Sequence, residues 1–208
     1  MPSTNTIRRV YKPAVHLLCL LPLLQLMAGA FGLAGVSLGA DPVARVLHGL
    51  GEWGLRFLVL TLAVTPLRFM LHQPWLLNFR RMFGLYAFTY VLLHFLTWLV
   101  LDQGMYWPGI LEDIAKRPFI TIGFAALLML IPLAATSTSR MMRRLGKRWH
   151  KLHRLVYVIA ILGVWHFWWL VKQDITEPLI YAAIVAFLLG YRYWRYRRKS
   201  TPPIASGA

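Results

Sequence analysis

The chain has 208 residues, of which 58% are hydrophobic and 14% are charged, and its formal net charge is +16. A mean hydropathy of +0.55 excludes an ordinary soluble domain and indicates an integral membrane protein. The basic residues lie in short runs between apolar segments, so the positive charge does not indicate nucleic-acid binding. The single cysteine, Cys19, excludes an internal disulfide and a cysteine-based metal or iron–sulfur site.

Apolar segments of bilayer length predict the fold class. A transmembrane helix needs about 20 residues, and six such segments can be drawn, over residues 14–35, 47–67, 82–101, 118–136, 153–171 and 177–194. We therefore expect an all-α integral membrane bundle of six transmembrane helices. The expected domain covers residues 14–196, between a cytoplasmic N-terminal tail at residues 1–13 and a cytoplasmic tail at residues 197–208.

Lysine and arginine are concentrated in alternate connecting segments, and this asymmetry predicts the orientation. Segments rich in basic residues stay in the cytoplasm. They carry Arg8, Arg9, Lys12, Arg68, Arg80, Arg81, Arg140, Arg143, Arg144, Lys147, Arg148, Lys151, Arg154, Arg192, Arg195, Arg197, Arg198 and Lys199. The seven acidic residues fall at or near the other side. Both termini are therefore predicted to be cytoplasmic.

Two of the seven histidines lie inside predicted helices rather than near their ends. His94 lies about 20 Å above Arg81, and His166 lies about 18 Å above Arg154, on helices that both rise from the cytoplasm. A buried imidazole is costly in lipid unless it has a partner. For one such histidine a hydrogen bond to another helix is the commoner explanation, but two at matching depth favour a shared ligand. Haem suits this position because neutral imidazole is a good iron ligand.

His153, at the cytoplasmic end of the same predicted helix as His166, suggests a second haem. On the predicted third span, Arg80 lies below His94 on nearly the same helix face. Arginine is a poor iron ligand but a good partner for a haem propionate. His150 is a rival ligand in the same region. On a straight helix His153 and His166 would not share a face, which counts against this lower site.

Several short stretches, taken together, resemble one family of membrane cytochromes. They are residues 79–85, 92–94, 136–139, 145–149 and 151–157, with His166, within about residues 45–195. The chain resembles the MsrQ (YedZ) family, the haem-binding membrane subunit of the MsrPQ methionine sulfoxide reductase system of Gram-negative bacteria. More distantly, it is similar to the ferric reductase and NADPH oxidase transmembrane domain.

The resemblance implies that His94 and His166 are the axial ligands of one haem b, and it offers His153 for a second haem. It implies electron relay from the quinone pool, or from a cytoplasmic flavin reductase, across the inner membrane to the periplasmic molybdoenzyme MsrP. FMN is implied too, although no FMN motif is visible. The chain would then be an electron-transfer subunit that does not itself act on methionine sulfoxide.

Two other functions stay open at this point. A stand-alone ferric reductase carries a flavin- and nicotinamide-binding domain, whereas this sequence has no Gly-rich dinucleotide fingerprint. A haem-free transporter or assembly protein would use His94 and His166 as proton relays or as contacts between helices.

Overall fold

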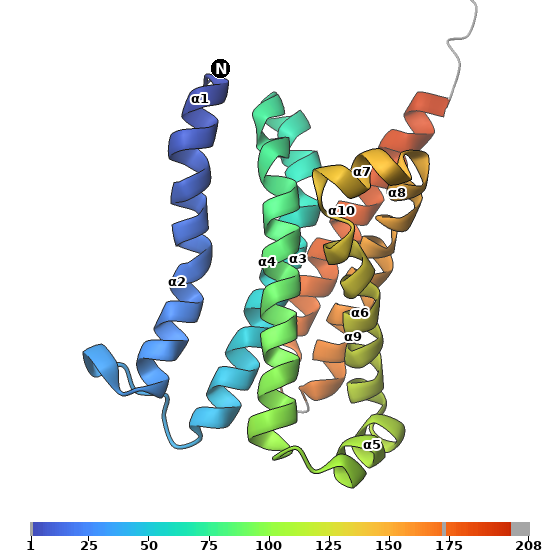
Figure 1. Ribbon diagram of the computed structural model, residues 1–208. Coiled ribbons are helices and arrows are strands. Elements are labelled where there is room, and N and C mark those ends of the chain that lie inside the picture. Colours follow the sequence, from blue (N-terminus) through green and yellow to red (C-terminus); the bar gives the residue numbers. More distant parts are fainter. Residues whose placement is uncertain (1, 172–173, 201–208) are drawn as a thin grey trace, which may run out of the picture.

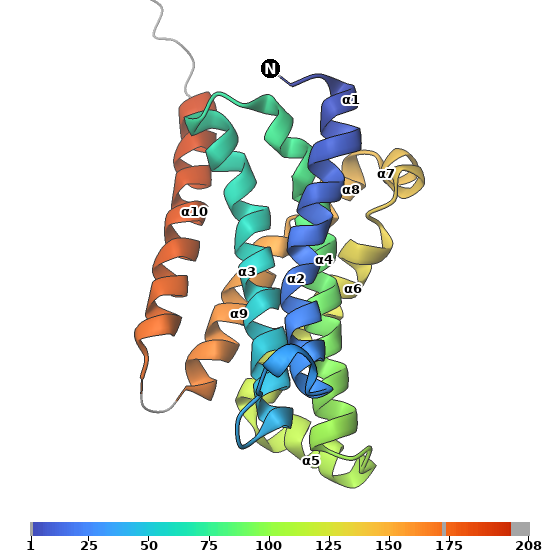
Figure 2. The same ribbon diagram turned by 90° about the vertical axis from the view of Figure 1, so that its left-hand side faces the viewer.

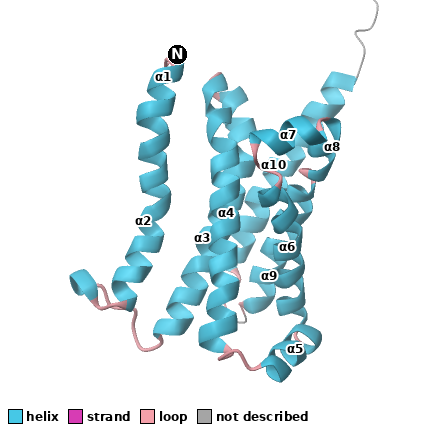
Figure 3. Cartoon of the chain, in the orientation of Figure 1, coloured by secondary structure: helices cyan, strands magenta, loops and turns pink. Residues whose placement is uncertain are grey.

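The structure is a computed structural model that describes residues 2–171 and 174–200. Within these ranges the chain consists of helices and short links, without a strand (Figure 3). The elements are α1 (Thr4–Thr6), the π-helical turn η1 (Ile7–Tyr11), α2 (Lys12–Ala30), η2 (Leu33–Gly35), α3 (Pro42–Met70), η3 (Pro74–Leu76), α4 (Leu77–Thr97), the π-helical turn η4 (Trp98–Asp102), α5 (Trp107–Lys116), α6 (Pro118–Ala135), α7 (Ser139–Leu145), α8 (Lys147–Leu152), α9 (Leu155–Leu170) and α10 (Thr176–Ser200). The predicted all-α class is confirmed.

Five helical segments are long and apolar enough to cross a membrane. They are Thr4–Ala30, Pro42–Met70, Pro74–Asp102, Pro118–Ala135 and Lys147–Leu170. The predicted integral membrane bundle is therefore confirmed. Helix α10 has 25 residues, but its C-terminal part is rich in arginine and it is not one of the five. The sixth span stays a prediction, and residues 201–208 of the predicted C-terminal tail lie outside the described residues.

The first helix begins ten residues earlier than the predicted span. The Ser3 side chain accepts a hydrogen bond from the Thr6 amide, and α1, η1 and α2 then follow without a break. Arg8 and Arg9 therefore lie on a helix rather than on an extended tail. The π-helical turn that carries them ends just before Pro13, whose ring nitrogen cannot donate to the helix.

Helices α3 and α4 pack together along their length at the centre of the bundle, and α6 and α9 form a second pair beside them (Figures 1 and 2). Leu62 of α3, Tyr90 of α4 and Ile159 of α9 are fully buried in the bundle. Close approach depends on Gly54 of α3, because a Cβ atom there would lie 2.7 Å from Val91 Cγ2. Small residues that allow close contact are a common feature of helix interfaces in membranes.

Helix α2 is joined to α4 by polar contacts. The Tyr90 hydroxyl donates to the Cys19 carbonyl at 2.8 Å and accepts from the Leu23 amide at 3.0 Å. In an uninterrupted helix the Leu23 amide would donate directly to the Cys19 carbonyl. The tyrosine hydroxyl is thus inserted into the hydrogen-bond ladder of α2, next to Pro22, and both interrupted groups keep a partner.

The two ends of the bundle differ in charge. The N-terminus, the α3–α4 connection, α7 and α8 lie at one end, called here the basic end (Figure 1). Helix α5 and the α2–α3 connection lie at the opposite end, called here the acidic end, with Asp41, Asp102, Glu112 and Asp113. The segments that the charge pattern assigns to one side of the membrane are thus brought together in space.

The charge asymmetry predicts that the basic end faces the cytoplasm. Alkaline phosphatase fused after the C-terminus should be inactive and green fluorescent protein fused there should fluoresce, while fusions at Asp113 should give the reverse pattern. Phosphatase activity from the C-terminal fusion would contradict the orientation.

Candidate functional site

The two internal histidines face each other near the acidic end of the bundle. His94 comes from α4 and His166 from α9, and their ring centroids are 6.1 Å apart with an angle of 80° between the ring planes. Counting residues along the predicted helices placed the two side chains at matching depth. The structure confirms this expectation and adds that the two rings are neighbours.

Each imidazole is held by a backbone carbonyl of another helix. His94 Nδ1 lies 2.9 Å from the Leu47 carbonyl oxygen of α3, and His166 Nδ1 lies 2.7 Å from the Phe119 carbonyl oxygen of α6. A carbonyl oxygen only accepts, so Nδ1 carries the proton in both rings and donates it. Nε2 of each ring therefore keeps its lone pair and is free to bind a ligand.

Two glycines allow these hydrogen bonds, and the sequence reasoning above missed both. Gly51 lies one turn after Leu47, and Gly123 lies one turn after Phe119. A Cβ atom at Gly51 would lie 3.1 Å from His94 Nδ1, and one at Gly123 would lie 2.8 Å from His166 Nδ1. In each helix the missing side chain leaves the space through which the imidazole reaches the carbonyl.

The arrangement offers two nitrogen lone pairs to one ligand. Metal–imidazole bonds are about 2 Å long, so two imidazoles on opposite sides of one metal ion have ring centres roughly 6 Å apart. The 6.1 Å separation agrees with that geometry. Among the described residues, no group of three or more histidine, cysteine, aspartate or glutamate side chains is placed to hold a metal ion. A metal between these rings would need further ligands from outside the protein.

The expected lower residue, His153, lies outside α9. The structure interrupts the predicted continuous helix, because α8 ends at Leu152 and α9 begins at Leu155. The straight-helix objection to a lower site therefore does not apply. The His153 ring stacks on Trp149 at 3.8 Å, and its Nδ1 lies 3.2 Å from the Trp149 carbonyl oxygen. Its Nε2 is buried and has no hydrogen-bond partner.

Arg80, the other residue expected at the lower site, begins the second turn of α4 at the basic end. It is half-buried, and its positive charge acts on the His153 ring. His94 and His166 belong to the opposite end of the bundle. The structure thus separates the four predicted residues into an upper pair and a lower pair.

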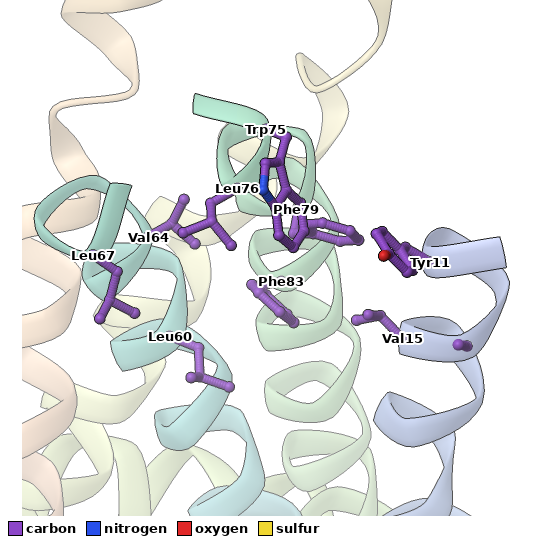
Figure 4. A pocket seen from close by; sticks show the side chains of 10 residues that line it. Tyr11, Val15, Leu60, Val64, Leu67, Trp75, Leu76, Phe79 and Phe83 are labelled. Atoms are coloured by element: carbon purple, nitrogen blue, oxygen red, sulfur yellow. The ribbon is translucent and has the colours of Figure 1, made fainter. Parts of the chain in front are cut away.

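A cavity of about 390 Å³ lies between α2, α3 and α4 at the basic end (Figure 4). It is lined by Tyr11, Ala14, Val15, Leu60, Val64, Leu67, Trp75, Leu76, Phe79 and Phe83. Ligand sites usually combine an apolar lining with a few polar groups that fix orientation. This lining is almost wholly apolar, so it does not define the chemistry of an occupant.

The Glu52–Arg56 pair begins directly after Gly51 on α3, and Arg56 joins this helix to α10. Arg56 Nη2 and Glu52 Oε2 are 3.0 Å apart, and Arg56 Nε donates to the Tyr181 hydroxyl at 3.1 Å. The two charged residues are one helical turn apart on α3, which is the spacing that brings side chains together on a helix surface. Both side chains are about one-third exposed, so the pair contributes little to stability.

These features define an integral membrane protein whose helical bundle encloses a pair of histidines. The family model for the ferric reductase like transmembrane component matches residues 50–164. A relative from Xanthomonas oryzae pv. oryzae (strain MAFF 311018) is 49% identical, with 99% of both chains covered. One from Ralstonia nicotianae is 50% identical, covering 96% of this chain and 93% of its own. Both are named protein-methionine-sulfoxide reductase heme-binding subunit MsrQ.

The chain therefore belongs to the MsrQ family of ferric reductase-like membrane proteins. No solved structure matches it.

Gly123→Ala should destabilise the protein, although alanine is the better helix former. The new methyl group would displace the His166 ring and break its hydrogen bond to Phe119, at a cost of about 1–3 kcal/mol. Gly190→Ala is the matched control, because nothing lies within 4 Å of a Cβ atom at that helical position. Thermal unfolding in detergent should show a lower midpoint for Gly123→Ala alone. Equal midpoints for the two variants would contradict the role given to Gly123.

Proposed function

We propose that this chain is the haem-binding electron-transfer subunit of a methionine sulfoxide reductase system in the inner membrane of a Gram-negative bacterium. Electrons would come from the quinone pool or a cytoplasmic flavin reductase and leave to a periplasmic molybdoenzyme of the MsrP type. That partner would then repair methionine sulfoxide in periplasmic proteins. The observation that carries the proposal is the His94–His166 pair, with both Nδ1 atoms held and both Nε2 atoms free. The names of the relatives, which describe a heme-binding subunit, support it.

Haem b fits the upper pair better than a bare metal ion does. Two imidazoles alone are too few ligands for most protein-bound metals, and the described residues offer no third side chain. A porphyrin supplies four nitrogen ligands of its own, so two axial histidines complete the coordination. When bound, haem iron takes up and releases one electron at a time. His94 and His166 are the proposed axial ligands.

The residues around the His94–His166 pair favour electron transfer over oxygen chemistry. The Leu47 and Phe119 carbonyls fix the tautomer and orientation of each ring, so the ligands need little reorganisation. Two axial imidazoles leave no coordination position for oxygen. Transfer is therefore favoured over a stand-alone oxidase or oxygenase activity at this site.

Electron delivery is proposed to occur at the acidic end, which is the nearer end to the histidine pair. Asp102, Glu112, Asp113, Asp174 and Glu177 lie on or beside the segments at that end. Complementary charge steers partners and fixes their orientation. A partner surface with basic groups would suit this rim.

Electron entry is proposed at the basic end, through a second haem held by His153. The buried Nε2 of His153 lacks a hydrogen-bond partner, and the Arg80 charge acts on this ring. Arg80 is proposed to pair with a haem propionate. The family resemblance also implies FMN, to which no residue of this chain is assigned.

Replacing His94 or His166 with alanine should remove the upper haem or convert it to a high-spin form, because one axial ligand is lost. His16→Ala is the control, since that side chain is exposed and contacts the Tyr86 hydroxyl rather than either internal histidine. Absorption spectra and pyridine haemochrome assays of the purified proteins measure the effect. His153→Ala should leave the upper haem in place. Unchanged low-spin spectra in both the His94→Ala and His166→Ala proteins would refute the ligand assignment.

NADPH alone should not reduce the bound haem at a significant rate. Nicotinamide-binding folds are built on a parallel β-sheet, and residues 2–171 and 174–200 contain no strand. Stopped-flow absorption should show haem reduction only after a reduced quinol or a flavin reductase is added, with dithionite as the positive control. Rapid reduction by NADPH in the absence of both donors would count against the proposed electron route.

A further inference from the structure

Arg192 reaches from α10 into the helix bundle at its basic end. Its Nη2 donates to the Leu62 carbonyl of α3 at 2.5 Å, and its Nη1 lies 3.4 Å from the Leu188 carbonyl. The guanidinium also lies over the Tyr157 ring of α9, 5.5 Å from its centroid. Arg192 is therefore a half-buried cation fixed between three helices and not a freely moving surface side chain.

A second guanidinium, that of Arg80, is close enough for the two positive charges to act on each other. Arg80 is also half-buried, and it takes part in none of the hydrogen bonds or ion pairs among the described residues. Its neighbour Arg81 differs, because it is exposed and its Nη1 contacts Ser139 Oγ at 3.5 Å. The positive charges of Arg80 and Arg192 thus repel each other at the basic end of the bundle.

No carboxylate of the described residues pairs with either of these two arginines. Within the described ranges, the ion pairs join Glu52 to Arg56, Glu112 to Lys116 and Asp113 to Arg117, all on the side of the acidic end. The remaining acids, Asp41, Asp102, Asp174 and Glu177, lie at that end as well. Cations withdrawn from water are costly unless an anion compensates them. Arg192 donates to two carbonyl oxygens, but neither arginine has a carboxylate partner among the described residues, so an anion from outside the chain would stabilise the pair.

A separate observation points to the same space. His153 Nε2 is buried without a hydrogen-bond partner, and Arg80 acts electrostatically on that ring. Buried polar atoms in native proteins almost always have a partner. An unpartnered imidazole nitrogen on a ring that the Arg80 charge acts on is a further group that a ligand of the two arginines would satisfy.

We infer that Arg192 and Arg80 form a binding site for the carboxylate or phosphate group of a ligand that enters between α3, α4, α9 and α10 at the basic end. The planar guanidinium binds both groups through paired N–H donors. The anion has two sources with this chemistry. One is a propionate of the lower haem, which rests on the proposed function, and the other is the phosphate of an anionic phospholipid, which does not.

The test compares Arg192→Gln and Arg80→Gln with two matched controls. Arg195→Gln changes an arginine on the same helix that stacks on Phe69 instead, and Arg81→Gln changes the exposed neighbour of Arg80. Each protein is purified from membranes that contain phosphatidylglycerol and cardiolipin. Haem content and midpoint potentials are measured by pyridine haemochrome assay and redox titration, and bound phospholipids are counted by native mass spectrometry.

If the ligand is a propionate, both test variants should lose the lower haem or change its midpoint potential, and bound lipid should be unchanged. The lower haem is the one that His153→Ala also removes. A phospholipid ligand predicts unchanged haem and a severalfold loss of bound anionic lipid. Arg192→Lys keeps the charge but loses the paired N–H donors, so it should restore part of either signal. The inference is overturned if both test variants match their controls in haem content, potential and bound lipid.

The upper haem serves as the internal reference for this experiment. Its low-spin spectrum should persist in every variant, which would show that the bundle is folded and that the upper pair still binds haem. If Arg192→Gln does not fold, Arg192→Lys and Arg80→Gln decide the question by the same measurements. Absence of haem from the unchanged protein would instead refute the proposed function, and bound lipid would still report on the arginine site.

Discussion

The hydrogen bond from a histidine Nδ1 to a helix carbonyl is the interaction on which the upper site depends. A carbonyl inside a helix already accepts from the amide one turn ahead, but its oxygen has a second lone pair. A side chain from another helix can reach that lone pair only where the helix surface is bare. Gly51 and Gly123 provide this access for His94 and His166, and both histidines use the same arrangement.

This constraint links helix packing to function. The pair α3–α4 brings the Leu47 carbonyl to His94, and the pair α6–α9 brings the Phe119 carbonyl to His166. The distance between the rings is then set by how these two helix pairs lie against each other, with Leu62 and Ile159 fully buried in the core. Because acidic residues surround one end and basic residues the other, the bundle gives the proposed electron path two chemically different faces.

Simple counting from the sequence predicted much of the site. Positively charged segments marked one face of the membrane, and the rise per residue placed His94 and His166 at the same depth. Counting could not show that the rings are neighbours, because depth carries no information about which helices are adjacent. The two glycines were missed for the same reason: their role depends on a partner helix. The signal that could have identified them is a glycine in the N-terminal part of a predicted transmembrane helix, because it leaves the carbonyl one turn earlier open to a side chain of another helix.

The lower region was predicted less well. The predicted fifth span begins at residue 153, whereas the structure places His153 in the turn between α8 and α9. Arg192 was counted only as a topology signal in the C-terminal segment. Its inward position depends on the Leu62 carbonyl of a helix far away in sequence, which no local pattern reveals. Local sequence thus identified the residue types, while long-range packing decided their partners.

The most direct test of the upper site is electron paramagnetic resonance of the oxidised protein carrying His153→Ala, in which the upper haem alone should remain. The His94 and His166 ring planes are nearly perpendicular, at 80°. Perpendicular imidazoles interact with different iron d orbitals and leave them close in energy, which gives a strongly anisotropic low-spin signal. The account predicts that signal, and it predicts its loss when either His94 or His166 is replaced. A high-spin signal, or the rhombic low-spin signal of parallel imidazoles, would contradict it.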